Sequence, residues 1–285
     1  MSEPAATDPG VSEPPEPGRV TGIGGLYFRC RDPDGLRGWY REHLGLPTAA
    51  DGGIWFEWRE LEGERLGRTV FQPCPETCER FDAGTRPFML RYRVDDLDAL
   101  LARLCEAGET VFDAEPPNDE GRFARLVDPD GQTVELFEPA GSPGDGTPAG
   151  GDVTPGGDVA GIGGIFFTSP EPAVRKAWYA DRLGILPGED GYVSFTSRTP
   201  EGDLAHLAWE IFPADTDYFE PSRQPFMVNF RVADLARLRA RLLEAPDVWV
   251  DPKLDEYEYG SFGWVLDPAG IRIELWEPID SAFEA

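Results

Sequence analysis

Alternating apolar and polar residues recur in short runs along the chain and predict β-strands. The runs are residues 54–58, 68–71, 89–94, 123–126 and 133–137. A period of two places successive side chains on opposite faces of a sheet, so each run predicts a strand with one face in the core. The sequence Asp128-Pro-Asp-Gly131 between the last two runs is typical of a tight turn, and we therefore expect these two strands to be antiparallel.

Longer segments with apolar residues three or four positions apart predict four helices, each after a strand. The first helix is expected to begin with Asp32 as N-cap and Pro33 in the first turn, and to end at Gly45. The equivalent third helix is expected to begin at Ser169 and to end before Gly184. The apolar faces of the second and fourth helices consist of Leu97, Leu100, Leu101 and Leu104, and of Leu235, Leu238 and Leu242.

Nearly the whole sequence consists of two copies of one repeat. Residues 21–139 return as residues 160–278, with a shift of one residue in the middle. The recurring positions are Gly25, Trp39, Tyr40, Gly45, Asp128, Pro129, Gly131 and Glu135, together with Pro75, Phe88, Met89, Arg93 and Val94. An alignment of this length that needs so small a shift indicates a duplicated domain.

Two domains fit the length of 285 residues, since single domains of about 100 to 150 residues are common. We place the domains at residues 19–139 and 160–279. Residues 1–18 are rich in proline, glutamate and serine and predict a disordered tail, residues 140–159 predict a flexible linker, and residues 280–285 form a second tail. Each domain contains a strand followed by a helix twice, so the predicted unit is βαβββ, in two copies per domain.

The chain is strongly acidic, with a formal net charge of −27 and only two lysines, Lys176 and Lys253. Such a surface repels phosphate groups, so nucleic acids and anionic membranes are poor partners. The N-terminal residues lack the charged start and apolar core of a signal peptide, and no apolar run is long enough to span a bilayer. We therefore expect a cytoplasmic protein whose acidity serves its solubility.

All four cysteines, Cys30, Cys74, Cys78 and Cys105, lie in the first repeat. A disulfide framework or a zinc site common to both domains is therefore excluded. Cys74 and Cys78 lie four positions apart without a neighbouring histidine, so we expect ordinary reduced thiols.

Three motifs in each repeat resemble one superfamily. They are GIGG before apolar and aromatic residues, RVxDL before a leucine-rich helix, and DPxGxxxEL before an aromatic residue and EP. This order resembles the glyoxalase, bleomycin-resistance and extradiol-dioxygenase group, the vicinal oxygen chelate superfamily. The resemblance implies an α+β fold in which paired βαβββ units form a curled, cup-like mixed sheet with helices outside and the ligand on the concave floor. It leaves the activity open, because the superfamily contains isomerases, lyases, dioxygenases and non-catalytic drug binders.

The resemblance also implies metal ligands at the start of each first strand and on each last strand. The first-strand positions are Gly25, Met89, Gly164 and Met227, and the last-strand carboxylates are Glu135 and Glu274. Glycine and methionine do not coordinate a hard or borderline divalent ion, and one carboxylate is too few for a catalytic metal, which usually has three protein ligands. We therefore expect no metal or other cofactor, and keep the two glutamates as candidate catalytic residues.

A divalent metal in the second domain is the alternative. Gln72 and Glu210 lie near the remaining last-strand position, within about one residue. His206 precedes Glu210 by four residues, which places both on one face of a strand, so His206, Glu210 and Glu274 could form a metal site. The other histidine, His43, lies in the last turn of a predicted helix, where it is expected to cap that helix or face solvent.

Strand alternation, phased on the ligand positions of the superfamily, assigns the side chains that would line each cup. The ligand-binding candidates are Tyr27, Arg29, Met89, Arg91, Arg93 and Phe137 in the first domain, and Phe166, Met227, Asn229, Arg231 and Trp276 in the second. The opposite phase, expected to pack under the helices, is Leu26, Phe28, Leu90, Tyr92, Val134 and Leu136. Aromatic walls with a methionine and a carboxylate beside arginine suit a planar or amphipathic small molecule.

A second interpretation of the arginines stays open, because a buried carboxylate requires a partner. The candidate partners are Arg91 and Arg93 for Glu135, and Arg231 and Arg272 for Glu274. Two equivalent segments, residues 114–121 and 251–260, are placed to lie over the mouths of the cups, where Tyr257 and Tyr259 could stack on a ligand.

The leading hypothesis is a metal-independent small-molecule binding protein of the drug-binding and resistance type, acting as a monomer or homodimer. The alternative is a lyase or isomerase of the glyoxalase-like group that uses Glu135 or Glu274 as general base, or a metal at Glu210. A third interpretation keeps the pocket of one repeat and converts the other repeat into an interaction surface.

Overall fold

A computed structural model describes residues 18–49, 52–61, 66–115, 117–140, 158–189 and 191–279, and Ala282. The expected N-terminal tail lies outside the described residues up to position 17, as do residues 141–157 of the expected linker and most of the expected C-terminal tail. The last two residues of the expected linker, Asp158 and Val159, are ordered: Asp158 forms ion pairs with Arg237 and Arg241, and Val159 begins a strand.

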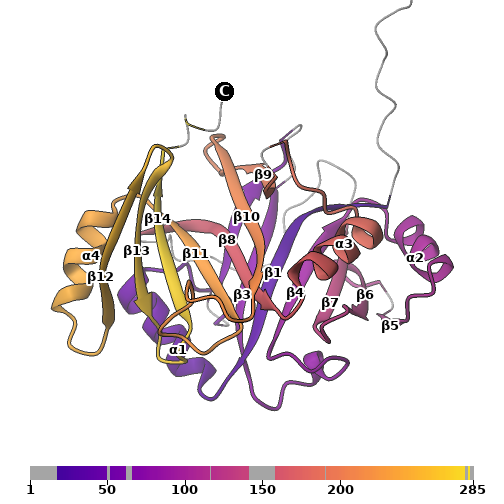
Figure 1. The fold of residues 1–285 in the computed structure, drawn as a ribbon, viewed down its shortest axis with the longest axis horizontal. Helices are drawn as coiled ribbons and strands as arrows, with labels where there is room; N and C mark the ends of the chain where they lie inside the picture. Colours follow the sequence, from indigo (N-terminus) through magenta and orange to yellow (C-terminus); the bar gives the residue numbers. More distant parts are fainter. Residues whose placement is uncertain are drawn as a thin grey trace, which may run out of the picture.

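The described residues of the two halves form corresponding series of elements (Figure 1). The first half contains β1 (Val20–Cys30), α1 (Pro33–Trp39), a π-helical turn η1 (Tyr40–Leu44), β2 (Trp55–Arg59), β3 (Leu66–Pro75), a 3-10 turn η2 (Glu79–Phe81), β4 (Phe88–Val94), α2 (Leu97–Glu106), β5 (Val111–Glu115), β6 (Gly121–Val127) and β7 (Thr133–Pro139). The second contains β8 (Val159–Ser169), α3 (Pro172–Leu183), β9 (Val193–Arg198), β10 (Leu204–Pro213), β11 (Phe226–Val232), α4 (Leu235–Glu244), β12 (Trp249–Tyr257), β13 (Gly260–Leu266) and β14 (Arg272–Pro278).

The helix ends follow the sequence signals with one exception. Asp32 caps α1 by accepting a hydrogen bond from the Gly35 amide, and Gly45 ends η1 with a φ of 64°. The third helix begins two residues later than expected, with Glu171 as its N-cap residue. The reason is that Ser169 stays in β8, where it pairs with Pro213 of β10.

The described strands form one curled, mixed sheet in the order β12-β13-β14-β11-β8-β10-β9-β2-β3-β1-β4-β7-β6-β5. In the first half, β1 runs antiparallel to β4 and parallel to β3. In the second half, β8 runs antiparallel to β11 and parallel to β10. The expected α+β class is confirmed. Within the residues that the structure describes, the expected βαβββ unit is complete only in the second unit of each half. In the first unit of the first half, Thr48 and Ile54 form only an isolated bridge.

The apolar faces of the two half-sheets share one core. Phe28 packs on Phe226 with ring centroids 5.5 Å apart, and Trp209 Nε1 donates a hydrogen bond of 2.8 Å to the Tyr92 hydroxyl. The expectation that this face packs under helices was incomplete, because short helices cover only part of each half-sheet and the other half covers the rest. At the edges, β2 and β9 meet through a single residue pair, Arg59 and Arg198.

Each first helix lies against the opposite half (Figure 1). Tyr40 of η1 bonds to Asp267 of the second half, and Trp178 of α3 donates to Glu109 of the first. The two halves are therefore held together by two related interfaces. No helix within the described residues has the length and apolar character needed to cross a bilayer.

Candidate functional site

The concave floor of the first half is built around Glu135 of β7, which is fully buried. Arg91 Nε donates to Glu135 Oε2 at 2.6 Å, Arg125 Nε donates to Oε1 at 3.0 Å, and Arg80 lies 3.5 Å from Oε1. Burial alone would raise the pKa of Glu135, but the positive charges of Arg91, Arg80 and Arg125 outweigh it and hold the pKa below its usual value. Glu135 is therefore a charged ion-pair partner and a poor proton acceptor.

Arg91 fills the centre of this floor. Its guanidinium carbon lies 4.9 Å from the ring centroid of Tyr27, 4.8 Å from that of Phe123 and 5.1 Å from that of Phe137. Arg91 is 5 % exposed and packs with Tyr27 and Phe137, while Met89 packs in one cluster with Tyr27. Cation–π contacts with three rings and an ion pair make this floor a packed structural unit.

The other two arginines expected on this floor do not reach Glu135. Arg29 donates to the Cys78 carbonyl at 2.9 Å and pairs with Asp82, and the Arg93 guanidinium carbon lies 3.5 Å from the ring centroid of Trp58. The proposed neutralisation of Glu135 by Arg91 therefore holds, and its neutralisation by Arg93 does not.

The floor of the second half has a different chemistry. Glu274 of β14 is 1 % exposed, and its carboxylate accepts hydrogen bonds from Asn229 Nδ2 at 2.7 Å, from Trp264 Nε1 at 2.8 Å and from the Tyr218 hydroxyl. Burial raises the pKa of Glu274, and these hydrogen bonds, together with the charge of Arg272, offset the rise only in part. Glu274 therefore binds a proton more readily than an ordinary glutamate.

Among the described residues, neither candidate arginine forms an ion pair with Glu274, and Arg272 acts on it only through its charge at longer range. Arg272 Nη2 donates instead to Asp251 at 2.9 Å, and the Arg231 guanidinium lies over Trp276, 5.2 Å from its ring centroid. The physical reason is that neutral donors already occupy both oxygens of Glu274.

A wall of aromatic rings leads from this floor to solvent. Phe262 stacks on Trp276 with centroids 5.8 Å apart, and Tyr257 and Tyr259 stack on each other at 5.2 Å and contact the edge of Phe262. Tyr257 is 51 % exposed. The corresponding positions of the first half hold Asn118 and Glu120, so the tyrosine pair belongs to the second half alone. Phe166 and Met227 pack with Trp264 in the same region.

Neighbouring atoms fill the space beside the two glycines at the first-strand ligand positions. A Cβ atom at Gly25 would lie 3.0 Å from the Tyr27 ring and from the Val70 carbonyl oxygen, and one at Gly164 would lie 2.7 Å from the Phe166 ring. The space of the absent ligand side chain is thus filled by the ring two positions along the same strand. A metal-binding histidine would not fit there without rearrangement.

The alternative metal site is not assembled either. Glu210 pairs with Lys176, His206 Nδ1 lies 3.3 Å from the Thr196 hydroxyl, and Glu274 has the neutral partners given above. The residues that the structure describes contain no group of three His, Cys, Asp or Glu side chains that could hold a metal ion. The donor set of both cups therefore does not fit a catalytic metal.

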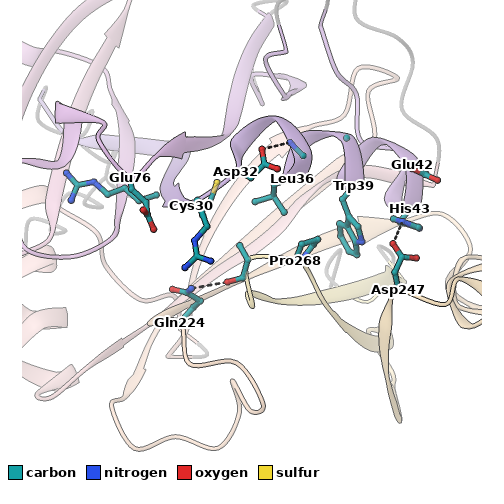
Figure 2. A pocket seen from close by; sticks show the side chains of 15 residues that line it. Cys30, Asp32, Leu36, Trp39, Glu42, His43, Glu76, Gln224, Asp247 and Pro268 are labelled. Atoms are coloured by element: carbon teal, nitrogen blue, oxygen red, sulfur yellow. Dashed lines mark hydrogen bonds and ion pairs between the residues drawn. The ribbon is translucent and has the colours of Figure 1, made fainter.

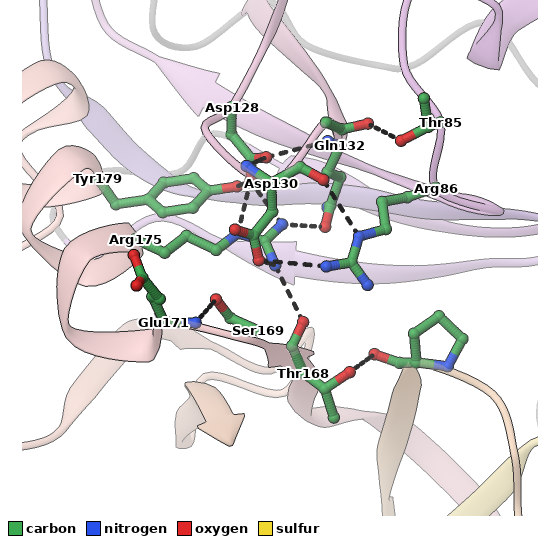
Figure 3. Close-up of polar contacts among 12 residues, drawn as sticks. Thr85, Arg86, Asp128, Asp130, Gln132, Thr168, Ser169, Glu171, Arg175 and Tyr179 are labelled. Atoms are coloured by element: carbon green, nitrogen blue, oxygen red, sulfur yellow. Dashed lines mark hydrogen bonds and ion pairs between the residues drawn. The ribbon is translucent and has the colours of Figure 1, made fainter. Parts of the chain in front are cut away.

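One of the two interfaces between the halves is closed by a buried ion cluster (Figure 3). Arg175 of α3 is 1 % exposed; its Nε donates to Asp128 Oδ2 at 2.7 Å and its Nη2 to Gln132 Oε1 at 2.5 Å. Asp130 pairs with the same guanidinium at 3.2 Å, and the Tyr179 hydroxyl donates to Asp128 at 2.8 Å. A cation and its carboxylates thus fix α3 on the first half.

The related interface lacks this cation, because Leu36 stands where the other repeat has Arg175. Asp267, the counterpart of Asp128, accepts hydrogen bonds from the Tyr40 hydroxyl at 2.5 Å and from the Ile271 amide at 2.8 Å. Burial raises its pKa to about 6, although these hydrogen bonds oppose the rise.

A groove of 790 Å³ opens beside this interface, between α1–η1 and the turn at Pro268 (Figure 2). His43 lies on this groove, 3.7 Å from Asp247, as the helix-end residue expected from the sequence. The groove and the two unequal interfaces were not predicted, although the leucine and arginine at equivalent positions of the repeats were a visible signal.

Several side chains that shape the floors were also missed. Arg125 lies opposite Glu135 in the β6–β7 hairpin, and Trp264 lies opposite Glu274 in the β13–β14 hairpin. The turn sequences at Asp128 and Asp267 fix this pairing, so the hairpin register could have located both residues. Tyr218 lies outside any strand, and no local sequence pattern indicates its contact with Glu274.

Comparison with known proteins agrees with this architecture. Residues 25–137 match the family model of a glyoxalase-like domain. A search of curated proteins finds no match to the sequence. A solved catechol 2,3-dioxygenase is similar with a TM-score of 0.57 at 16% identity, covering 92% of this chain and 90% of that one.

Two further solved structures share the fold. The Mn(II)-bound glyoxalase from Novosphingobium aromaticivorans has a TM-score of 0.56 at 18% identity, covering 91% of this chain and 83% of that one. The 2,3-dioxygenase LapB from Pseudomonas sp. KL28 has a TM-score of 0.52 at 18% identity, covering 91% and 92%. At these identities the likeness concerns the fold.

Proposed function

Because residues 25–137 form a glyoxalase-like domain and the chain has the fold of the vicinal oxygen chelate superfamily, we propose that it is a metal-independent small-molecule binding protein. The ligand is an aromatic or amphipathic molecule, and the concave face of the second half holds it. The first half supports the second across their shared core. The protein works in the cytoplasm as a monomer or homodimer, and its net charge of −27 disfavours nucleic acids and anionic membranes as partners.

The observation that carries this proposal is the Oδ1 atom of Asn229. Asn229 is 2 % exposed, its Nδ2 donates to Glu274, and its Oδ1 has no hydrogen-bond partner. An unsatisfied buried acceptor costs about 1–3 kcal/mol. The Oδ1 atom is closed to solvent and lies beside Gly163 of β8, so a ligand N–H or O–H would recover this energy once the Asn229 side chain rotates toward the cup. In the first half the equivalent residue is Arg91, which pairs with Glu135 through its Nε.

The aromatic wall supports the same assignment. Tyr257 and Tyr259 present a stacked, partly exposed pair next to Phe262 and Trp276. Planar molecules gain from such surfaces through offset or edge-to-face contacts with the rings. The ligand class that follows is a planar aromatic compound with one hydrogen-bond donor.

Binding should be measured with phenols and aromatic amines by calorimetry and thermal shift, with a chelator present throughout. Asn229→Ala and the double variant Tyr257→Ala/Tyr259→Ala are expected to weaken binding at least about tenfold, which corresponds to about 1.4 kcal/mol. Trp249→Ala removes another exposed ring of β12 and is the matched control. Equal binding by all variants, or binding that appears only with a divalent ion, contradicts the proposal.

The raised pKa of Glu274 favours one second candidate, a lyase or isomerase in which Glu274 is the general acid–base. Glu135 is unsuited to this role because three arginines keep it charged. If the protein turns over a bound ligand, Glu274→Gln should abolish turnover and preserve binding, since the amide keeps the size and most hydrogen bonds. Retained turnover would remove Glu274 from the mechanism.

A further inference from the structure

We propose that Cys74 and Cys78 form a reversible dithiol–disulfide pair at the rim of the first cup. Cys74 is the penultimate residue of β3, and the chain then turns back through a hydrogen bond of 2.9 Å from the Cys78 amide to the Pro75 carbonyl. Both cysteine side chains pack in one cluster with Tyr27, Phe81 and Met89, and the Cys74 thiol donates to the Gln72 carbonyl at 3.6 Å. Two cysteines that flank one tight turn and share a cluster need little movement to bond.

The two sulfur atoms differ in access. Cys74 is 7 % exposed and packs with Tyr27, Phe81 and Met89, whereas Cys78 is only partly buried. Burial, with the adjacent Cys78 thiol, raises the pKa of Cys74 to about 12. Cys78 is therefore the thiol that an external reagent meets first, and Cys74 is placed to react second.

The oxidant is a low-molecular-weight disulfide. The Cys78 thiolate attacks one of its sulfur atoms, the external S–S bond breaks, and one small thiolate leaves. The Cys74 sulfur then attacks Cys78 Sγ, giving its proton to the second departing thiolate as the mixed disulfide breaks. The two protein thiols are oxidised to one disulfide, and the external disulfide is reduced to two thiols.

The other cysteines lack this arrangement. Cys105 is exposed on α2, and Cys30 is buried with its pKa raised by burial to about 11. The second half contains no cysteine. Cys105 thus serves as an internal reference for a thiol that can only form a mixed disulfide with the reagent.

Oxidation has a structural consequence for the first cup. A disulfide has an S–S length of about 2.05 Å, shorter than any thiol–thiol contact, so Cys78 must move toward Cys74. The 3-10 turn η2 follows directly and carries Arg80, which lies 3.5 Å from Glu135 and over the Tyr27 ring. The oxidation state of the pair is thereby coupled to the ion cluster of the first floor.

The test uses the full native chain incubated with oxidised glutathione, then alkylated and mapped by peptide mass spectrometry. The expected result is a Cys74–Cys78 cross-link, lighter than the reduced peptides by two hydrogen atoms and reversed by dithiothreitol, with a glutathione adduct on Cys105. A persistent adduct on Cys78 with Cys74 free would overturn the proposal. So would an unreacted pair while Cys105 is modified.

Matched variants check the order of attack. Cys74→Ser should trap a stable glutathione adduct on Cys78, whereas Cys78→Ser should leave the buried Cys74 unmodified, and Cys105→Ser should not change the cross-link. Rapid modification of Cys74 in the Cys78→Ser protein would contradict the assigned roles. The peptide map of the unaltered chain decides the main question even if a variant folds poorly.

Discussion

Glu135 and Glu274 occupy equivalent positions on the last strands of the two halves, and their buried carboxylates have opposite environments. Three arginines surround Glu135 and lower its pKa, whereas tyrosine, asparagine and tryptophan side chains surround Glu274, whose pKa is raised by burial. Duplication preserved the carboxylate and changed its chemistry. The first floor is a packed ion cluster, and the second holds a carboxylate bound by neutral donors.

Replacing the two carboxylates by amides should separate these roles. Glu135→Gln removes the buried carboxylate that pairs with Arg91 and Arg125 and leaves Arg91 only the exposed Glu120 at 3.8 Å, which costs about 3 kcal/mol of unfolding free energy. Glu274→Gln should cost about 1 kcal/mol, because the free Oδ1 of Asn229 can accept from the new amide after a side-chain flip. Urea unfolding at neutral pH measures both changes in unfolding free energy. Equal losses in the two variants would contradict the different environments assigned to Glu135 and Glu274.

Asp267 predicts a specific pH dependence of stability. Its pKa is raised in the folded protein from 3.8 to about 6, so the folded state binds the proton more tightly than the unfolded chain. Its favourable contribution is complete below about pH 4 and is lost as the pH rises through 6, a change of about 3 kcal/mol. Asp267→Asn should remove this loss and gain stability relative to the natural chain between pH 4 and 7.

The matched control for Asp267 is Asp128→Asn in the related interface. That substitution removes one of the two carboxylates paired with the buried guanidinium of Arg175, leaving Asp130 at 3.2 Å, and should destabilise the protein by about 3 kcal/mol at neutral pH. Unfolding curves recorded across the pH range compare the two variants. A constant difference between Asp267→Asn and the natural chain would show that Asp267 does not titrate in this range.

The cation cluster at α3 should dominate the pairing of the halves. Arg175→Met replaces the aliphatic part of the side chain but leaves Asp128 buried without a cation, and should cost about 3–5 kcal/mol. Leu36→Met at the equivalent position preserves apolar volume and should cost less than about 1.5 kcal/mol. Thermal and urea unfolding of both variants test this, and similar losses would argue that the cluster contributes little.

Gly164, at the first-strand ligand position, should not tolerate even the methyl group of alanine. Gly164→Ala would place a Cβ atom 2.7 Å from the Phe166 ring, so an overpacking cost of about 1–3 kcal/mol is expected. Gly161→Ala on the same strand meets only Arg231 at 3.9 Å and should change stability by about 0.5 kcal/mol or less. If Gly164→Ala is as well tolerated as the control, the space is not filled as described.

The sequence predicted the fold well because its signals are local. The cap at Asp32 begins the first helix and the glycine at position 45 ends the π-helical turn that follows it, as expected. The alternation in the run from Phe88 to Val94 also gave the correct faces: Met89 and Leu90 lie in different clusters on opposite sides of the sheet.

The candidate site was less accessible from the sequence because its contacts are long-range. Arg80 and Tyr218 reach the two carboxylates from segments outside the strands, so no strand period indicates them. The pairing of Arg175 with Asp128 depends on how the two halves pack, which pattern and spacing do not encode. Comparing the repeats residue by residue was the remaining source of information, since differences such as Leu36 against Arg175 mark where the halves diverged.

The most direct test of metal-independent binding is the thermal shift produced by a planar phenol or aromatic amine on the metal-stripped protein in the presence of a chelator. The account predicts a rise in melting temperature that persists with chelator and is lost in Asn229→Ala. A purified protein that holds a stoichiometric divalent ion, with a ligand shift that disappears on chelation and returns with the ion, would contradict it.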